Sequence, residues 1–425
     1  MALRRAIVLA VLLAFGQPVV ADTAGPVADA PLSAPANDAA PVDEAGSAAL
    51  DDERTEERTL WNREPGLAFG DEQGAFYVHP WLRAQLRYSN PFDSDPLTVA
   101  ELQSPPGSDL ELRRGRIKVE GHFFDPRLGF YYEQELTGER PLLDLRLDIE
   151  LRPNLLLRVG QYKVLYNRER VDSSGKQQFV ERSIATYAFT LDRQRGATVA
   201  GHFAEGSAAD QWWMAGVFQG DGRSPGPRGD DPMWVLRWQW QFLGQPLKFA
   251  QSDYAFTETP AASFSLAAAR VRGPYTRFSS SGGGQLDGFE QGGDERYTLE
   301  QWQQGFAWKH SGFSVQQEYH HKTIDDHETG LRSKLSGGYV QAGKAWPMRL
   351  GGRSFPFELA ARYARVEWRD SPQDRNQYET SMVANLFLSG HDNKLSAELS
   401  RLRVNEPGSG SDSDLRVQLQ WDVSF

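Results

Sequence analysis

Long segments in which apolar and polar residues alternate are the feature that most limits the folds open to this 425-residue chain. From residue 76 onward, such segments run for roughly ten to thirteen residues each. Four clear examples are residues 143–151, 234–242, 355–363 and 415–425. Because successive side chains of a strand point to opposite faces, each segment has one apolar and one polar face. The pattern predicts an all-β chain.

A soluble β-sandwich would give the same alternation, so three further features decide between it and a membrane barrel. The segments are longer than an ordinary strand, which has about five or six residues. Aromatic residues gather near the segment ends on the apolar face, as they do at the two interfaces of a membrane. A last segment ending at Phe425 would leave an aggregation-prone apolar edge in water, whereas a closed barrel pairs that edge. These features favour a transmembrane antiparallel β-barrel.

The number of strands follows from the length of the alternating part. Residues 74–425 can hold sixteen strands with their connections, and bacterial barrels have an even number. The alternating segments number seventeen, so we expect one of them, between Leu247 and Trp308, not to be a separate strand.

The connections between these segments alternate in length. In the first half of the chain the long ones are 90–109 and 165–190, and the short ones are 124–127, 152–154 and 243–246. External loops and periplasmic turns of a barrel differ in this way. The Gly-rich stretch 273–293 breaks the rule, because the count of segments places this long connection on the short-turn side.

The N-terminal region predicts export. Arg4 and Arg5 precede an apolar run over residues 6–15, and small residues precede a cleavage point after Ala21. Residues 22–73 are rich in Ala, Pro, Asp and Glu and cannot bury enough apolar surface to offset the entropy of ordering. We therefore expect a signal peptide over 1–21, a disordered segment over 22–73, and a barrel over 74–425 in the bacterial outer membrane.

Composition excludes several classes of function. The chain has no cysteine, which rules out disulfide scaffolds, Cys-ligated metals and thiol nucleophiles. Its formal charge of -11 argues against nucleic acid as a partner. The charge is unevenly placed, because residues 110–200 carry 16 basic and 13 acidic side chains, a local net of +3.

The basic residues of this positive stretch are the candidate functional residues. Residues 165–190 form a loop of a length that is usually functional. Folded inward, this loop would narrow the pore and present guanidinium groups, whose permanent charge and planar fork suit anions. A plainer interpretation is that these cations are paired with Glu120, Glu169 and Glu181. The candidates for lining the pore and selecting anions are Arg114, Arg116 and Lys118 on one strand phase, Arg168, Arg170, Lys176 and Arg182 in the loop, and Arg193 and Arg195 after it.

Two blocks of sequence resemble the phosphate-selective porin O and P family. One block is Arg113-Arg114-Gly115-Arg116, and the other runs from Gly160-Gln161-Tyr162-Lys163 through Phe179-Val180-Glu181-Arg182-Ser183 to Gly196. The resemblance implies a 16-stranded, trimeric outer-membrane porin that conducts anions past an arginine ladder and a constriction loop. It implies that Arg113, Arg114 and Arg116 belong to the ladder. It also implies that Arg168, Arg170 and Arg182 lie in or beside the constriction loop.

The expected function is passive diffusion of small anions, phosphate among them, or of other small hydrophilic solutes, without a reaction and without a cofactor. Lysine is scarce in this chain, and the loop holds only Lys176, which leaves open a general or organic-acid nutrient porin without phosphate specificity. A third alternative is an outer-membrane hydrolase or binding barrel, although no Gly-x-Ser-x-Gly motif supports an esterase. His320, His321 and residues 325–327 surround an expected loop tip, so no metal site is predicted there.

Overall fold

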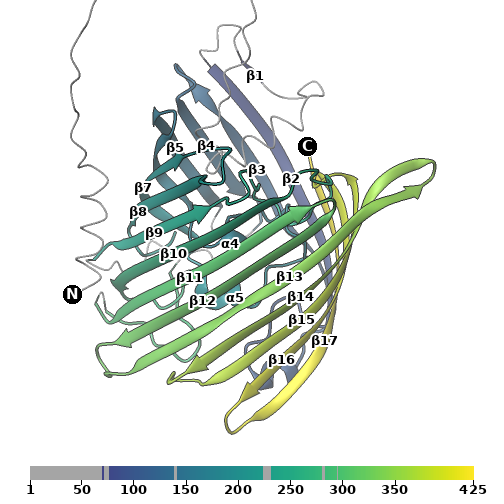
Figure 1. The fold of residues 1–425 in the computed structure, drawn as a ribbon. Coiled ribbons are helices and arrows are strands. Elements are labelled where there is room, and N and C mark those ends of the chain that lie inside the picture. The colour runs from purple at the N-terminus through teal and green to yellow at the C-terminus, as the bar shows by residue number, and fades with distance from the viewer. Residues whose placement is uncertain (1–68, 71–75, 138–140, 224–230, 280–282, 294) are drawn as a thin grey trace, which may run out of the picture. The chain divides into compact units, whose positions relative to one another are not determined.

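The computed structural model describes residues 69–70, 76–137, 141–223, 231–279, 283–293 and 295–425. Its elements are almost all strands (Figure 1). In chain order they are β1 (Phe69–Gly70), β2 (Phe76–Asn90), α3 (Val99–Gln103), β3 (Asp109–Phe123), β4 (Leu128–Glu135), β5 (Leu142–Arg152), β6 (Leu155–Lys163), α4 (Arg168–Val171), α5 (Ala185–Phe189), β7 (Arg193–Phe203), β8 (Gln211–Phe218), β9 (Met233–Trp240), β10 (Ala261–Gly273), β11 (Tyr297–His310), β12 (Phe313–Asp326), β13 (Arg332–Leu350), β14 (Arg353–Arg369), β15 (Arg375–Ser389), β16 (Asn393–Glu406) and β17 (Gly410–Ser424).

The strands β2 to β17 form one closed antiparallel sheet in which each strand pairs with its neighbours in the chain. Closure comes from β17, which pairs with β2, and the last residue continues this ladder. The amide N–H of Leu82 donates to the carbonyl of Phe425 at 2.7 Å, and the amide N–H of Phe425 donates back at 3.0 Å. In the described part of the chain, sixteen strands make the barrel, and β1 adds a two-residue pairing to β2. The predicted β-barrel of sixteen strands is confirmed.

The alternation places charge inside and apolar side chains outside. On β17, Trp421 is 47% exposed while the next residue, Asp422, is 1% exposed. On β14 the same holds for exposed Leu359 and Tyr363 beside buried Arg362. A soluble protein would show the reverse burial, so the outer face of this sheet is suited to lipid and the lumen to water. None of the helices in the described ranges is both long and apolar enough to cross a membrane.

The two ends of the barrel have connections of different length, with two corrections to the predicted scheme. The Gly-rich stretch after β10, residues 274–296, lies at the long-loop end, so its predicted place on the short-turn side is wrong. The predicted short turn 243–246 is also wrong, because β9 and β10 are joined by residues 241–260 at the short-turn end. That connection folds into the lumen, where Leu247 and Phe249 are buried without joining the sheet. We expected one surplus segment between Leu247 and Trp308. Among the described residues, β10 is the one barrel strand that lies wholly within this region, and the barrel has sixteen strands, as expected.

The alternation of inward and outward side chains is interrupted at β5. The pairing of β4 with β5 passes from Glu133–Asp144 to Gln134–Leu142, so Leu143 is an extra residue in a β-bulge. Sequence periodicity places Leu143 on the outer face with Leu145, but it is buried and lines a cavity in the lumen. A bulge puts two successive residues on similar sides of a strand, which alternation alone does not reveal.

The predicted signal peptide over 1–21 lies outside the described residues. So does the predicted disordered segment 22–73, except for Phe69 and Gly70, which pair with β2. These two boundaries stay predictions.

Candidate functional site

The connection between β6 and β7, residues 164–192, crosses the lumen and carries the short helices α4 and α5 (Figure 1). Its backbone is bound to the opposite wall of the barrel. The amide of Val180 donates to Glu398 of β16 at 2.7 Å, and the amide of Ile184 donates to Glu379 of β15 at 3.0 Å. Residues 164–192 are therefore an inward-folded constriction loop, as the sequence predicts.

Two charged side chains of the loop form hydrogen bonds with other residues of the same loop. Glu169 is buried and accepts hydrogen bonds from the amide of Ser183 at 2.7 Å and from the hydroxyl of Thr186 at 3.0 Å. The guanidinium of Arg182 donates to the carbonyl oxygens of Glu169 and Asp172, at 2.9 and 2.8 Å. These bonds satisfy backbone groups that would otherwise be buried without partners, so they define the shape of the loop.

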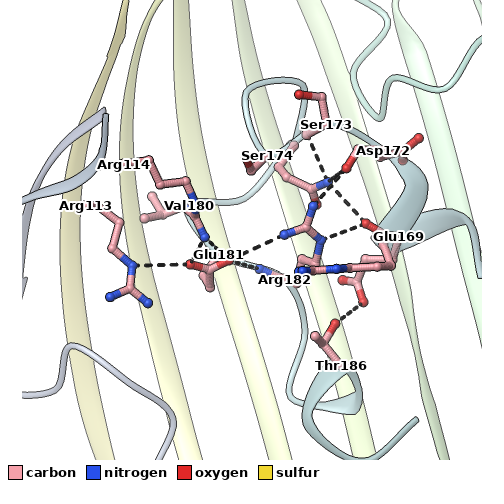
Figure 2. Close-up of polar contacts among 12 residues, drawn as sticks. Arg113, Arg114, Glu169, Asp172, Ser173, Ser174, Val180, Glu181, Arg182 and Thr186 are labelled. Atoms are coloured by element: carbon pink, nitrogen blue, oxygen red, sulfur yellow. Dashed lines mark hydrogen bonds and ion pairs between the residues drawn. The ribbon is translucent and has the colours of Figure 1, made fainter. Parts of the chain in front are cut away.

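Glu181 is the acidic centre of an arginine cluster (Figure 2). Its carboxylate accepts from Arg114 at 2.9 Å and from Arg87 at 3.1 Å, and it lies 3.8 Å from the guanidinium of Arg113 and 4.0 Å from that of Arg182. Burial alone would raise the pKa of Glu181, but the surrounding guanidinium groups outweigh it and hold the pKa well below its usual range. One carboxylate thus faces four guanidinium groups. Arg113 is also paired with Glu111 at 3.2 Å, so two carboxylates meet four arginines and the cluster keeps a surplus of positive charge.

A β-bulge on β3 explains why two successive arginines reach this carboxylate. The pairing of β2 with β3 passes from Gln85–Arg114 to Leu86–Leu112, which leaves Arg113 as an extra residue. In a regular strand Arg113 and Arg114 would point to opposite faces, whereas the bulge brings both to Glu181.

A cavity of about 670 Å³ lies at the long-loop end of the lumen beside this cluster. Loops from that end supply Asp95, Thr137, Arg223 and Ser279 to its lining, and the constriction loop supplies its floor. Eight arginines and four carboxylates line it, which gives a formal surplus of four positive charges. They are Arg113, Arg114, Arg116, Arg170, Arg182, Arg193, Arg223 and Arg277, with Asp95, Glu135, Glu181 and Asp192.

Several of these arginines have carboxylate partners, as the plainer interpretation of the sequence expects. Glu181 is one that it named, whereas Glu133, Glu135 and Asp144 are partners that it did not name. Arg116 binds Glu133 and Glu135 at 2.9 and 2.7 Å. Arg193 binds Glu133 and Asp144 at 3.0 and 2.7 Å. Arginines outnumber carboxylates two to one in the lining itself, but Glu133 and Asp144 do not line the cavity, so they lower the net positive charge around it below the formal surplus of four.

The ten residues predicted to line the pore divide into two groups. Four of them do not line the cavity. Arg168 lies over the ring of Phe249 at 4.8 Å, and Lys118 lies over the ring of Trp81 at 4.7 Å. The six that line the cavity are Arg113, Arg114, Arg116, Arg170, Arg182 and Arg193.

The other two outside the cavity are Lys176 and Arg195. Lys176 is half-buried in the loop, where its carbonyl accepts from the amide of Gln251 at 3.3 Å. Arg195 shares the strand phase of Ala197, not that of the buried Thr198, and it forms an ion pair with Asp221 at 2.5 Å.

Two arginines and one aromatic residue of the cavity are not among the residues predicted from the sequence. Arg277 lies over the ring of Tyr187 at 4.8 Å, and both line the cavity. Arg223 donates to the carbonyl of Leu142 at 2.8 Å. Arg223 and Arg277 belong to loops far from residues 110–200 in the chain, and loops have no strand phase, so periodicity carried no signal for them.

Asp172 gives a prediction about pH and stability. It is fully buried, and neither carboxylate oxygen accepts a hydrogen bond from the described residues. Burial raises its pKa, against the lowering influence of Arg168 and Lys309. Because a raised carboxyl pKa favours the protonated folded state, ionisation above that pKa costs stability. Asp172→Asn should therefore raise the free energy of unfolding at pH 8 by on the order of 1 kcal/mol.

Urea unfolding from phospholipid bilayers measures this difference. The gain should shrink as the pH falls through the raised pKa, since wild-type Asp172 then becomes neutral as well. Glu406→Gln, a change at a half-buried position at the long-loop end of β16, is the control. An unchanged or lower midpoint for Asp172→Asn at pH 8 would contradict the assignment.

Of the histidines considered for metal binding, His327 lies in the connection between β12 and β13, as expected, but His320 and His321 do not lie at a loop tip. His320 and His321 lie within β12 on opposite faces. His320 is buried in the lumen and stacks on Phe189 at 5.1 Å, whereas His321 lies beside Trp302 at 6.0 Å. Within the described residues, no group of three His, Asp or Glu side chains is placed to hold a metal ion.

A closed sixteen-strand barrel with an apolar outer face, a charged lumen and a loop folded across that lumen defines a bacterial outer-membrane porin. The model of the phosphate-selective porin O and P family matches residues 99–400. The chain therefore belongs to this family, in agreement with the resemblance in its sequence. A search of curated protein sequences finds no match.

Solved outer-membrane proteins share the fold at low sequence identity. A loop-deletion mutant of OmpT from Vibrio cholerae is similar with a TM-score of 0.55 and 10% identity, over 83% of this chain and 100% of that chain. The channel DcaP of Acinetobacter baumannii has a TM-score of 0.53 and 11% identity, over 84% and 99%. An anion-selective porin from Comamonas acidovorans has a TM-score of 0.53 and 12% identity, over 82% and 100%. Family and fold together identify an outer-membrane channel for small solutes.

Proposed function

We propose that this channel is a passive diffusion porin that prefers anions and catalyses no reaction. The observation that carries the proposal is the excess of eight arginines over four carboxylates in the lining of the 670 Å³ cavity, beside the four guanidinium groups that share Glu181. The porin from Comamonas acidovorans, described as anion-selective, supports the same preference at the level of the fold.

The mechanism is electrostatic. Guanidinium groups of the cavity replace part of the hydration of an entering anion and exclude cations from the floor of the cavity. The carboxylates of Glu135, Glu181 and Asp192 offset part of this attraction, so an anion is not held too tightly to leave. All eight cations of the lining are arginines, whose fork suits phosphate and carboxylate oxygens alike. The solutes we propose are therefore small oxoanions, phosphate or organic acids.

Reversal potentials in planar bilayers under a salt gradient test the proposal. We expect the wild-type potential to have the sign of anion preference, and the preference to weaken at high salt because salt screens the charges. Arg113→Gln and Arg114→Gln should each lower the ratio of chloride to potassium permeability by about twofold to fivefold, since each removes a charge worth roughly 1 kcal/mol. Arg401→Gln, at an exposed position of β16, should leave the ratio unchanged.

A cation preference of the wild-type channel would refute the proposal. Competition between chloride, phosphate and a dicarboxylate for the same current would then distinguish a phosphate channel from an organic-acid channel. We also propose a homotrimer, as in the trimer form of OmpT from Vibrio cholerae, and native mass measurement in detergent tests it.

A further inference from the structure

The connection between β9 and β10, residues 241–260, is an unexpected feature of the short-turn end. The other short-turn connections that link barrel strands are much briefer; β11 and β12, for example, are joined by residues 311–312. The long connection is buried at residues 247 and 249–253, although these residues form no part of the sheet. The polar residues among them, Gln251, Ser252 and Asp253, are buried because the connection lies inside the barrel against other lumenal groups.

The connection extends from its own strands to a distant part of the wall. Ser252 donates to Glu358 of β14 at 2.7 Å. The ring of Tyr254 stacks on Phe387 of β15 at 4.8 Å and meets His391 edge-on at 4.9 Å. In the closed sheet β14 and β15 lie five and six strands from β9, so the connection spans the lumen and does not follow the wall.

Its return to β10 is also fixed. Asp253 accepts from the amide of Gly312 at 2.6 Å and from the amide of Thr257 at 3.1 Å. The carbonyl of Thr257 accepts from the amide of Ser311 at 2.8 Å. These bonds tie the connection to the turn between β11 and β12, so both ends of the crossing are anchored.

The connection and the constriction loop meet in one hydrogen-bonded layer. The side-chain oxygen of Gln251 accepts from the amide of Gln178 at 2.8 Å, and the amide of Gln251 donates to the carbonyl of Lys176 at 3.3 Å. Gln341 of β13 donates to the side-chain oxygens of both Gln178 and Gln251, at 3.0 and 3.2 Å. The tip of the loop therefore rests directly on the connection.

Glu358 joins the same layer to the wall. Its carboxylate accepts from Gln178 of the loop at 2.7 Å, from Ser252 of the connection at 2.7 Å and from Asn385 of β15 at 2.9 Å. The wall has a glycine where Gln178 docks, since a Cβ on Gly343 would lie 2.2 Å from the amide nitrogen of Gln178. A buried carboxylate satisfied by three separate elements favours one rigid arrangement of all three.

We propose that residues 241–260 form a second constriction, which enters from the short-turn end and limits the size of the solutes that pass. The side chains that it presents in this layer are neutral, since Gln251 meets the loop and Ser252 meets Glu358. The arginine cavity lies at the long-loop end and includes no residue of the connection. Size selection and charge selection are thus assigned to different elements. The inference rests on the chain being a channel, and not on its preference for anions.

The register of the sheet allows the connection to be replaced by a tight turn. Trp240 pairs with Phe264, so extending β9 by three residues places Leu243 opposite Ala261. Replacing residues 244–260 by Asn-Gly would close this hairpin with a two-residue turn. We expect the single-channel conductance to rise at least about twofold, and larger neutral polyethylene glycols to enter the pore, because a lumenal obstruction is removed.

A second variant tests the inference even if the shortened protein does not fold. Ser252→Ala combined with Tyr254→Ala keeps the chain length but removes both contacts with β14 and β15, so conductance and current noise should increase. Gln245→Ala combined with Thr259→Ala changes two exposed residues of the same connection and should leave both unchanged.

Wild-type conductance and wild-type polymer exclusion in the folded variants would overturn the inference. The sign of the reversal potential reports separately on the proposed function. A rise in conductance with cation preference would uphold the second constriction and refute the anion porin. Unchanged conductance with anion preference would refute the second constriction and uphold the anion porin.

Discussion

Arg362→Met should lower the free energy of unfolding by about 3–5 kcal/mol, the range for removing one partner of a buried ion pair. Arg362 is 2% exposed on β14 and lies 2.6 Å from Glu379 and 4.0 Å from Glu398. It also donates to the carbonyl of Glu181 at 3.0 Å and lies over the ring of Phe179 at 4.2 Å. Methionine keeps the length of the side chain, but two buried carboxylates lose their guanidinium and the loop loses a bond to the wall.

Urea unfolding from phospholipid bilayers measures the loss, and the open-channel current gives a second readout. We expect larger current noise, since the loop would be held to β14–β16 by fewer bonds. Arg401→Met makes the same substitution at an exposed site and should change the free energy of unfolding by less than about 0.5 kcal/mol. Equal midpoints for Arg362→Met and wild type would show that this ion-pair group does not stabilise the fold.

The double variant Arg113→Glu/Arg114→Glu should change the sign of the ion preference. Two reversals change the charge of the cavity lining by four, which removes its formal surplus of positive charge. They also place two carboxylates beside Glu181, which Arg113 and Arg114 now neutralise at 3.8 and 2.9 Å. At about 1 kcal/mol per charge at contact distance in water, the permeability ratio should change by more than about tenfold.

The reversal potential under a salt gradient checks this outcome. Arg401→Glu/Arg403→Glu is the matched control, because these arginines are exposed on β16 and are likewise two reversals on one strand. Retained anion preference in the Arg113→Glu/Arg114→Glu variant would exclude the cavity as the selective element, even if the wild-type channel prefers anions.

The barrel could be predicted from sequence because its signal is repeated in every strand. Residues such as Leu419 and Gln420 on β17 alternate over a length that only paired strands explain, and burial follows that alternation. The constriction loop was predictable as well, since its length and its arginines distinguish it from an ordinary turn. The resemblance to a family added Arg113, which alternation assigns to the outer face.

The remaining features depend on contacts between distant parts of the chain. Leu143 points inward because of a bulge, and a bulge has no signature in the pattern of apolar residues. The connection 241–260 contains Leu247 and Phe249 at alternate positions, which imitates the start of a strand, yet its partners are loop and wall residues far away in sequence. Arg223 and Arg277 reach the cavity from loops whose course depends on the finished barrel.

A regular strand offers the lumen one side chain for every two residues of its length. The extra residue in β3 raises that ratio locally, so Arg113 and Arg114 deliver two charges to one level of the pore. Leu112 stays exposed on the outer face just before them. The density of fixed charge is therefore adjustable by inserting or deleting a single residue. Deleting Arg113 would restore continuous pleating and remove one charge from the pore, while the outward set of side chains keeps its place.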